Sequence, residues 1–131
     1  LPLGSHRDVQ ALNAGHSIPF VWRKSDRSVF AIPRGGPALG FVPDERYSPH
    51  APLVLASGDV LAVYTDGLVE ARSPGGEKEM FGEEGLKRAL GELAQSDRSA
   101  KEIALGIVER ALRLSQNVRE DDITLVVARR L

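Results

Sequence analysis

The stretch LAVYTDGLVEA, residues 61–71, decides how this chain folds. Its first residues continue an apolar run that begins at Val60, and neither face of the run is polar, which predicts a central strand covered on both faces. The run stops just before Asp66 and Gly67, and a helix-like segment follows. A buried strand that ends in this way would hold the Asp66 carboxylate at a fixed place on the rim of a sheet.

Composition narrows the possible functions. The chain has 131 residues, with 17 Lys and Arg, 18 Asp and Glu, and no cysteine. This length is typical of one domain, which buries about two-thirds of its unfolded surface. Nearly balanced charges argue against general binding to nucleic acid or to an anionic membrane, and the lack of cysteine excludes disulfides and thiolate chemistry. No apolar run approaches the ~20 residues that span a bilayer, so we expect a soluble, cytoplasmic protein.

The N-terminal residues look unlike a natural start. The chain begins with leucine, and Gly-Ser-His follows at residues 4–6. We therefore expect residues 1–6 to be a cloning or cleavage remnant and residues 7–131 to form the domain. Neither an internal repeat nor a dividing linker is evident in the sequence.

The first half of the chain is patterned as strands. Short apolar runs at 9–13, 18–22 and 28–33 predict a meander of antiparallel strands, with Phe20 and Trp22 in the core. Residues 34–52, with three glycines and four prolines, predict a long loop. Two further strands follow, and the segment 57–59 between them is either a hairpin turn or a bulge.

The second half is patterned as helices and one last strand. From Phe81, apolar residues recur at the spacing of an amphipathic helix. Ser99 and Glu102 have the spacing of a capping box, which predicts a second helix that ends near residues 115–117. Residues 123–128 return to a buried strand. Strands and helices segregated along the chain predict an α+β layered fold.

Carboxylates stand at the ends of two predicted strands. Asp66 follows the strand at 60–64, and Asp121 and Asp122 precede the strand at 123–128. If these strands pair antiparallel, the acids meet at one rim of the sheet, where like charges beside an apolar layer need a cation or protons to neutralise them. Oxygen ligands favour hard ions such as Mg²⁺ or Mn²⁺, and Gly67 lets the backbone turn sharply behind Asp66.

The same acids have a second interpretation. Asp-Gly after a strand is a common turn signal, and acids before a strand can cap a helix or keep a region soluble. Two separated acids do not make a motif, so spacing alone leaves both interpretations open.

Two other polar residues are candidates for function. Arg34 precedes the loop sequence GGPALG, and its planar guanidinium suits a substrate phosphate, although a solvated arginine is the alternative. His16, in a turn beside Asn13, is either a proton shuttle or a structural hydrogen-bonding residue, and we favour the structural role.

Five ordered blocks carry a resemblance to a known family. They are NAGHSIP (13–19), GGPALG (35–40), GDVLAVYTDGLVEAR (58–72), FGEEGL (81–86) and DDITLVV (121–127). In this order and spacing they resemble the C-terminal portion of metal-dependent (PPM-type) serine/threonine phosphatases, in particular the bacterial branch of stage II sporulation protein E and its sigma-regulator relatives. The resemblance covers nearly everything from residue 8 onward. It implies an α-β-β-α sandwich, in which two antiparallel sheets are flanked by helices. Residues 7–131 would form only part of this sandwich, without its N-terminal strands.

The resemblance also implies a chemistry. Asp66 of YTDG and Asp121 match metal-ligand aspartates of a site for two Mn²⁺ or Mg²⁺ ions. Gly67 and Asp122 are candidates for contacts that support these ligands, and a strand cap is the alternative role of Asp122. In the family, the paired ions activate a water that attacks the phosphorus of phosphoserine or phosphothreonine. The usual substrates are phosphorylated anti-anti-sigma (STAS) proteins, which would place the parent protein in bacterial signal transduction as a phosphoric monoester hydrolase.

One departure from the family pattern affects activity. The family has, upstream of the NAGH block, an aspartate before Gly-His-Gly that bridges the two metals, and Gly15-His16 is not that segment. We therefore expect greatly weakened metal binding and no turnover by this chain alone. We also expect association with an N-terminal segment or with a second copy through uncovered sheet surfaces. A non-catalytic module that binds a sigma-regulatory partner is the alternative, and a small acidic metal-binding domain without phosphatase ancestry is a third.

Overall fold

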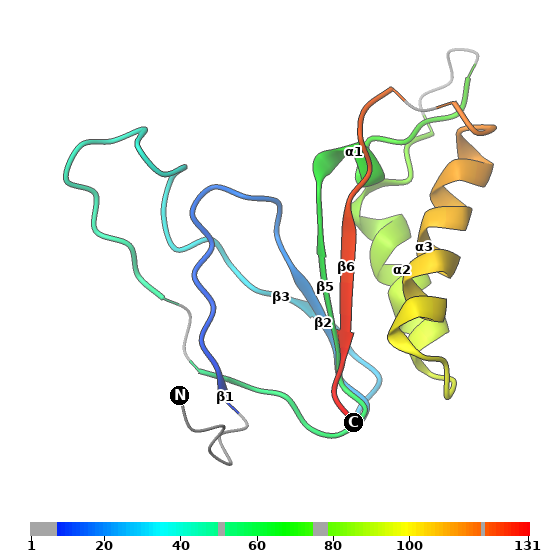
Figure 1. The fold of residues 1–131 in the computed structure, drawn as a ribbon, viewed down its shortest axis with the longest axis horizontal. Helices are drawn as coiled ribbons and strands as arrows, with labels where there is room; N and C mark the ends of the chain where they lie inside the picture. The colour runs from blue at the N-terminus through cyan, green and yellow to red at the C-terminus, as the bar shows by residue number, and fades with distance from the viewer. Residues whose placement is uncertain (1–7, 50–51, 75–78, 119) are drawn as a thin grey trace.

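An antiparallel sheet with two long helices on one face forms the body of the molecule (Figure 1). This computed structural model describes residues 8–49, 52–74, 79–118 and 120–131. The predicted remnant, residues 1–6, lies outside these ranges. In the described part of the chain, no helix is both long and apolar enough to cross a membrane.

The main sheet has four strands in the order β3-β2-β5-β6, and each neighbouring pair is antiparallel. Their bounds are β2 (Phe20–Trp22), β3 (Val29–Ala31), β5 (Val60–Tyr64) and β6 (Leu125–Arg129). In the β5-β6 register, Tyr64 lies opposite Leu125 and Val60 opposite Arg129. The end of β5 therefore lies beside the start of β6. This is the arrangement under which the carboxylates at the two strand ends were expected to meet.

Helices α2 (Gly82–Ala94) and α3 (Ala100–Leu114) cover one face of this sheet. The capping box predicted at the start of α3 is confirmed, because the Ser99 hydroxyl accepts from the Glu102 N–H and the Glu102 carboxylate accepts from the Ser99 N–H. Beneath the helices, Phe20 and Tyr64 stack with ring centroids 6.0 Å apart. Phe20 and Trp22 are buried, which confirms their predicted place in the core.

The first predicted strand is shorter than expected and belongs to another sheet. β1 (Asp8–Val9) pairs with β4 (Leu53–Val54) in a separate two-stranded sheet. The predicted strand 9–13 therefore stops at Val9, and the meander prediction was wrong for it. The physical reason is local, since the buried Asn13 side chain hydrogen-bonds to the backbone of its own turn.

The segment 57–59 is not a hairpin turn, because β4 and β5 belong to different sheets. Gly58 has a φ of +91°, and the Asp59 side chain, only 1% exposed, holds the corner together. Its carboxylate accepts from the N–H groups of Lys24 and Ala56, both at 2.9 Å, and lies 3.6 Å from the Arg23 guanidinium. This carboxylate therefore fixes the passage from the small sheet to β5.

The second face of the main sheet is covered only in part. A second apolar cluster, built on Val21, Ile32, Leu53 and Leu55, packs the small sheet against one side of the main sheet. Leu61 and Val63 of β5 are only partly buried, and Val126 of β6 is 58% exposed. The predictions that both faces of β5 are covered and that residues 123–128 are buried were therefore wrong, because β6 is an edge strand and the described residues supply no layer over it.

Candidate metal centre

Thr65 locks the end of β5 to the segment that precedes β6. Its N–H donates to the carbonyl of Thr124 at 3.0 Å, and its hydroxyl oxygen accepts from the Thr124 N–H at 3.0 Å. The same hydroxyl donates to the carbonyl of Asp122 at 3.3 Å. These three bonds extend the β5-β6 pairing past Tyr64. They therefore fix the position of Asp66 relative to the segment that carries Asp121 and Asp122.

Directly after Thr65, the short helix α1 (Asp66–Val69) begins. Gly67 is buried, and a Cβ atom at this position would overlap the carbonyl oxygen of Asp122 and lie 3.4 Å from the Cβ of Asp121. The first turn of α1 therefore packs directly on the two aspartates. This contact brings the two predicted ligands, Asp66 and Asp121, to the same edge of the sheet.

Both candidate ligands are exposed, and each accepts a hydrogen bond from the backbone of the residue that follows it. The Asp66 carboxylate accepts from the Gly67 N–H at 3.2 Å. The Asp121 carboxylate accepts from the Asp122 N–H at 2.7 Å. Asp122 contributes its backbone N–H and carbonyl to these contacts, and its side chain is exposed.

Asp66 and Asp121 offer the type of ligand that a hard cation prefers, but they are too few to hold one alone. Carboxylate oxygens suit Mg²⁺ or Mn²⁺. Among the residues that the structure describes, however, no group of three or more His, Cys, Asp or Glu side chains is placed to hold a metal ion. The described residues therefore hold no complete site of this kind.

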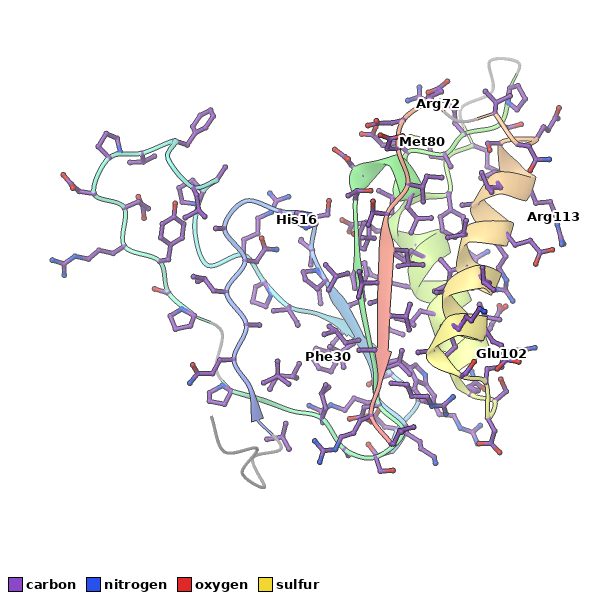
Figure 2. All side chains as sticks on the ribbon, in the orientation of Figure 1. His16, Phe30, Arg72, Met80, Glu102 and Arg113 are labelled. Carbon is purple, nitrogen blue, oxygen red and sulfur yellow. The ribbon has the colours of Figure 1, made fainter. Side chains whose placement is uncertain are left out.

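A cavity of about 250 Å³ opens beside Asp121. It is lined by Gly67 and residues 70–74 from the region after β5, and by residues 118, 120, 121 and 123 from the region before β6. At its rim, Arg72 Nε lies 3.1 Å from a carboxylate oxygen of Glu120. Figure 2 shows Arg72 at the same end of the sheet as α1. We call this feature the Asp121 cavity. No sequence motif indicated it, because its two walls meet only through the β5-β6 register.

Tyr64 is the last residue of β5, two residues before Asp66, and its pKa is raised. Burial, the negative charge of Glu83 and a 3.5 Å hydrogen bond that the Tyr64 hydroxyl donates to Glu83 raise the pKa of Tyr64 to about 12. The positive charge of Arg34 acts in the opposite direction.

Arg34 is exposed, and its Nε donates to the carbonyl of His16 at 3.3 Å. The predicted phosphate-contact residue therefore lies at the same end of the main sheet as the two aspartates.

The turn that contains His16 is held by Asn13. The Asn13 side chain donates to the carbonyls of His16 and Ser17 and accepts from the His16 N–H at 2.8 Å. The His16 ring itself is exposed, and its Nδ1 lies 3.2 Å from the Ser17 carbonyl (Figure 2). These contacts agree with the structural role that the sequence favoured for His16.

Solved structures define the class of this fold. The chain superposes on the RsbU and RsbW domains of Rv1364c from Mycobacterium tuberculosis with a TM-score of 0.74 and 26% identity, over 96% of this chain and 33% of that chain. It superposes on the PP2C phosphatase domain of SpoIIE from Bacillus subtilis with a TM-score of 0.72 and 23% identity, over 93% of this chain and 34% of that chain. The fold is that of a PPM-type (PP2C) phosphatase domain, present in part.

The chain belongs to the stage II sporulation protein E (SpoIIE) family, whose sequence profile matches residues 4–131. It is 31% identical over 128 residues to protein IcfG of Synechocystis sp., covering 96% of this chain and 19% of IcfG. It is 30% identical over 121 residues to phosphoserine phosphatase RsbU of Bacillus subtilis, covering 90% of this chain and 33% of RsbU. The chain thus spans a third or less of the length of these two relatives.

These comparisons confirm the family and the fold that the five sequence blocks implied. One of the two relatives, RsbU, is named a phosphoserine phosphatase. Family membership also removes the third interpretation, a metal-binding domain without phosphatase ancestry.

Proposed function

We propose that this chain forms the C-terminal part of a metal-dependent phosphatase domain that removes phosphate from phosphoserine or phosphothreonine in a regulatory protein of the STAS anti-anti-sigma type. The observation that supports this proposal most is the packing of Gly67 on Asp121 and Asp122, which brings Asp66 and Asp121 to one edge. RsbU, a relative at 30% identity, is named a phosphoserine phosphatase.

Asp66 and Asp121 would each give carboxylate oxygens to Mn²⁺ or Mg²⁺. A SpoIIE phosphatase domain with the same fold has been presoaked with Mn. Bound divalent ions supply an activated water at neutral pH and offset charge on the phosphoryl oxygens. Since no group of three or more His, Cys, Asp or Glu side chains among the described residues is placed to hold a metal ion, the remaining ligands would come from parts of the parent protein upstream of this chain.

The chain's other residues position the site and the substrate. Thr65 and Gly67 hold the two aspartate segments together. Arg34, whose Nε donates to the His16 carbonyl, would contact the substrate phosphate through its guanidinium fork. The partly uncovered face around Leu61, Val63 and Val126 is where an upstream segment, or a second copy, would pack.

The test compares this chain with a longer polypeptide that includes the upstream part of the parent. Each is assayed against a phosphoserine peptide with and without Mn²⁺. We expect hydrolysis only by the longer polypeptide and only with the ion. Asp66→Asn or Asp121→Asn should each abolish it. Full activity of either variant would contradict the assignment of that residue.

The incomplete donor set favours one alternative, a non-catalytic module that binds a sigma-regulatory partner. This alternative predicts that the longer polypeptide binds a phosphorylated STAS protein but does not dephosphorylate it at any Mn²⁺ concentration. Binding and turnover measured on the same preparation distinguish the two functions.

A further inference from the structure

We propose that the Asp121 cavity receives a basic side chain of the phosphoprotein substrate, Lys or Arg, close to the phosphorylated residue. The proposal rests on the proposed function, because Asp121 marks the edge at which the phosphate would be held. According to this proposal, the phosphatase recognises a positive charge near the phosphorylated residue as well as the phosphate itself.

The size of the cavity points to a side chain. Pockets for drug-sized molecules and cofactors span roughly 300–1,000 Å³. The Asp121 cavity, at about 250 Å³, lies below that range. A single long side chain is therefore a better match than a separate small molecule.

The lining of the cavity points to a basic side chain. Ala71, Pro74, Val118 and Ile123 give it apolar walls. Besides the candidate metal ligand Asp121, two carboxylates, those of Glu70 and Glu120, line it together with one guanidinium. Lys and Arg bury an aliphatic stem along apolar surface and keep a charged head in a polar rim. The combination of apolar walls and an acidic rim is complementary to that pattern.

The rim already shows the interaction that such a side chain would make. Arg72 pairs with Glu120 at 3.1 Å, and both side chains are about half exposed. A substrate cation can therefore pair with Glu70, or compete with Arg72 for Glu120, without opening a buried ion pair. Glu70 is fixed at the end of α1, where its N–H donates to the carbonyl of Asp66 at 2.9 Å. The acidic rim is thus tied to the candidate ligand itself.

The position of the cavity limits where the basic residue lies in the substrate. Asp121 lines the cavity and is also a candidate metal ligand. An extended chain advances about 3.3 Å per residue. A side chain within about three residues of the phosphoserine therefore reaches the cavity while the phosphate lies at the aspartate edge.

The test uses a panel of phosphoserine peptides and the longer polypeptide that carries the upstream segment. Each peptide carries Lys, Glu or Ala at one of about three positions on either side of the phosphoserine. At one of these positions we expect kcat/KM to be about fivefold higher for Lys than for Glu, the size of an exposed ion pair near 1 kcal/mol. Glu70→Lys should bring this ratio to one or below, and the milder Glu70→Gln should reduce it.

Glu109→Lys is the matched control. Glu109 lies on α3, is exposed, and pairs with Arg113 at 2.8 Å. This variant should keep the activity and the Lys preference of the wild type. A Lys-to-Glu ratio near one in the wild type, or a ratio that Glu70→Lys and Glu70→Gln leave unchanged, would overturn the proposal.

Peptide binding without turnover separates this proposal from the proposed function. The same peptides are labelled, and their Kd values are measured by fluorescence anisotropy. If no peptide is hydrolysed but a Lys preference in binding is lost in Glu70→Lys, the phosphatase function fails and the cavity assignment stands. If peptides are hydrolysed with no charge preference, the cavity assignment fails and the phosphatase function stands.

Discussion

Gly67 packs so closely on Asp122 that a Cβ atom at position 67 would overlap the carbonyl oxygen of Asp122. The contact joins the first turn of α1 to the segment before β6, across the end of the β5-β6 pair. A larger residue would have to push this backbone away, and Asp121 would move with it. The relative position of the two candidate ligands therefore depends on a glycine.

Gly67→Ala should destabilise the fold by about 1–3 kcal/mol, the usual cost of forcing atoms into a packed site. The obstacle is backbone, so it cannot rotate away. Gly91→Ala is the control, because a Cβ there meets only Val29 Cγ2, at 3.8 Å, within helix α2. We expect that variant to gain roughly 0.5–1 kcal/mol from helix propensity. Urea unfolding measures both, and equal stability of the two variants would contradict the close packing at Gly67.

The buried carboxylate of Asp59 gives a second stability prediction. Asp59→Asn places an amide NH₂ against one of two backbone donors, so we expect a loss of about 2–4 kcal/mol. Asp26 is the comparison, since it also accepts two hydrogen bonds, from Ser28, but is exposed. Asp26→Asn should therefore cost much less than Asp59→Asn. If thermal unfolding shows similar losses, the corner at Asp59 is not the structural joint described above.

Tyr64 gives a pH prediction. Its pKa is raised to about 12 by burial first and then by Glu83, whereas an unfolded tyrosine titrates near 10. The protonated hydroxyl is favoured in the fold, so its contribution is fully present below about pH 10 and is lost as the pH rises toward about 12. The loss should be of order 2 kcal/mol. Comparing the pH dependence of unfolding of the wild type and Tyr64→Phe checks this, because only the wild type should show the extra loss.

Arg34 gives a prediction on activity. If its guanidinium contacts the substrate phosphate, Arg34→Ala in the longer polypeptide should lower kcat/KM roughly tenfold or more, as expected for a charged hydrogen bond of about 1.5–3 kcal/mol. Arg46 is an exposed arginine further along the same loop, and Arg46→Ala is the control. Steady-state assays that find the two variants equally active would remove Arg34 from the site.

Local sequence patterns predicted the elements that depend on near neighbours. The capping box at Ser99 and the apolar spacing of α2 involve residues within a few positions of each other, and both are confirmed. The antiparallel pairing of β5 with β6 was a condition of the metal-site interpretation of the acids, and the observed register meets that condition.

Patterns failed where distant parts of the chain decide the outcome. An apolar run at 60–64 does not show which layer covers it, and the described chain covers Leu61 and Val63 only in part. The apolar run at 9–13 predicts a strand, but the strand ends at Val9. The Asn13 side chain instead forms hydrogen bonds with the His16 backbone and stabilises a turn. The Asp121 cavity has no local signal, since residues near 70 and near 120 form it together.

The central claim is that Asp66 and Asp121 share one divalent ion. Anomalous diffraction at the manganese edge, on Mn²⁺-soaked crystals of the longer polypeptide, tests it most directly. We predict a peak with carboxylate oxygens of both residues close to it, within about 2.0–2.6 Å of the metal. A manganese peak in an active enzyme that contacts neither residue, or only one of them, would contradict the claim.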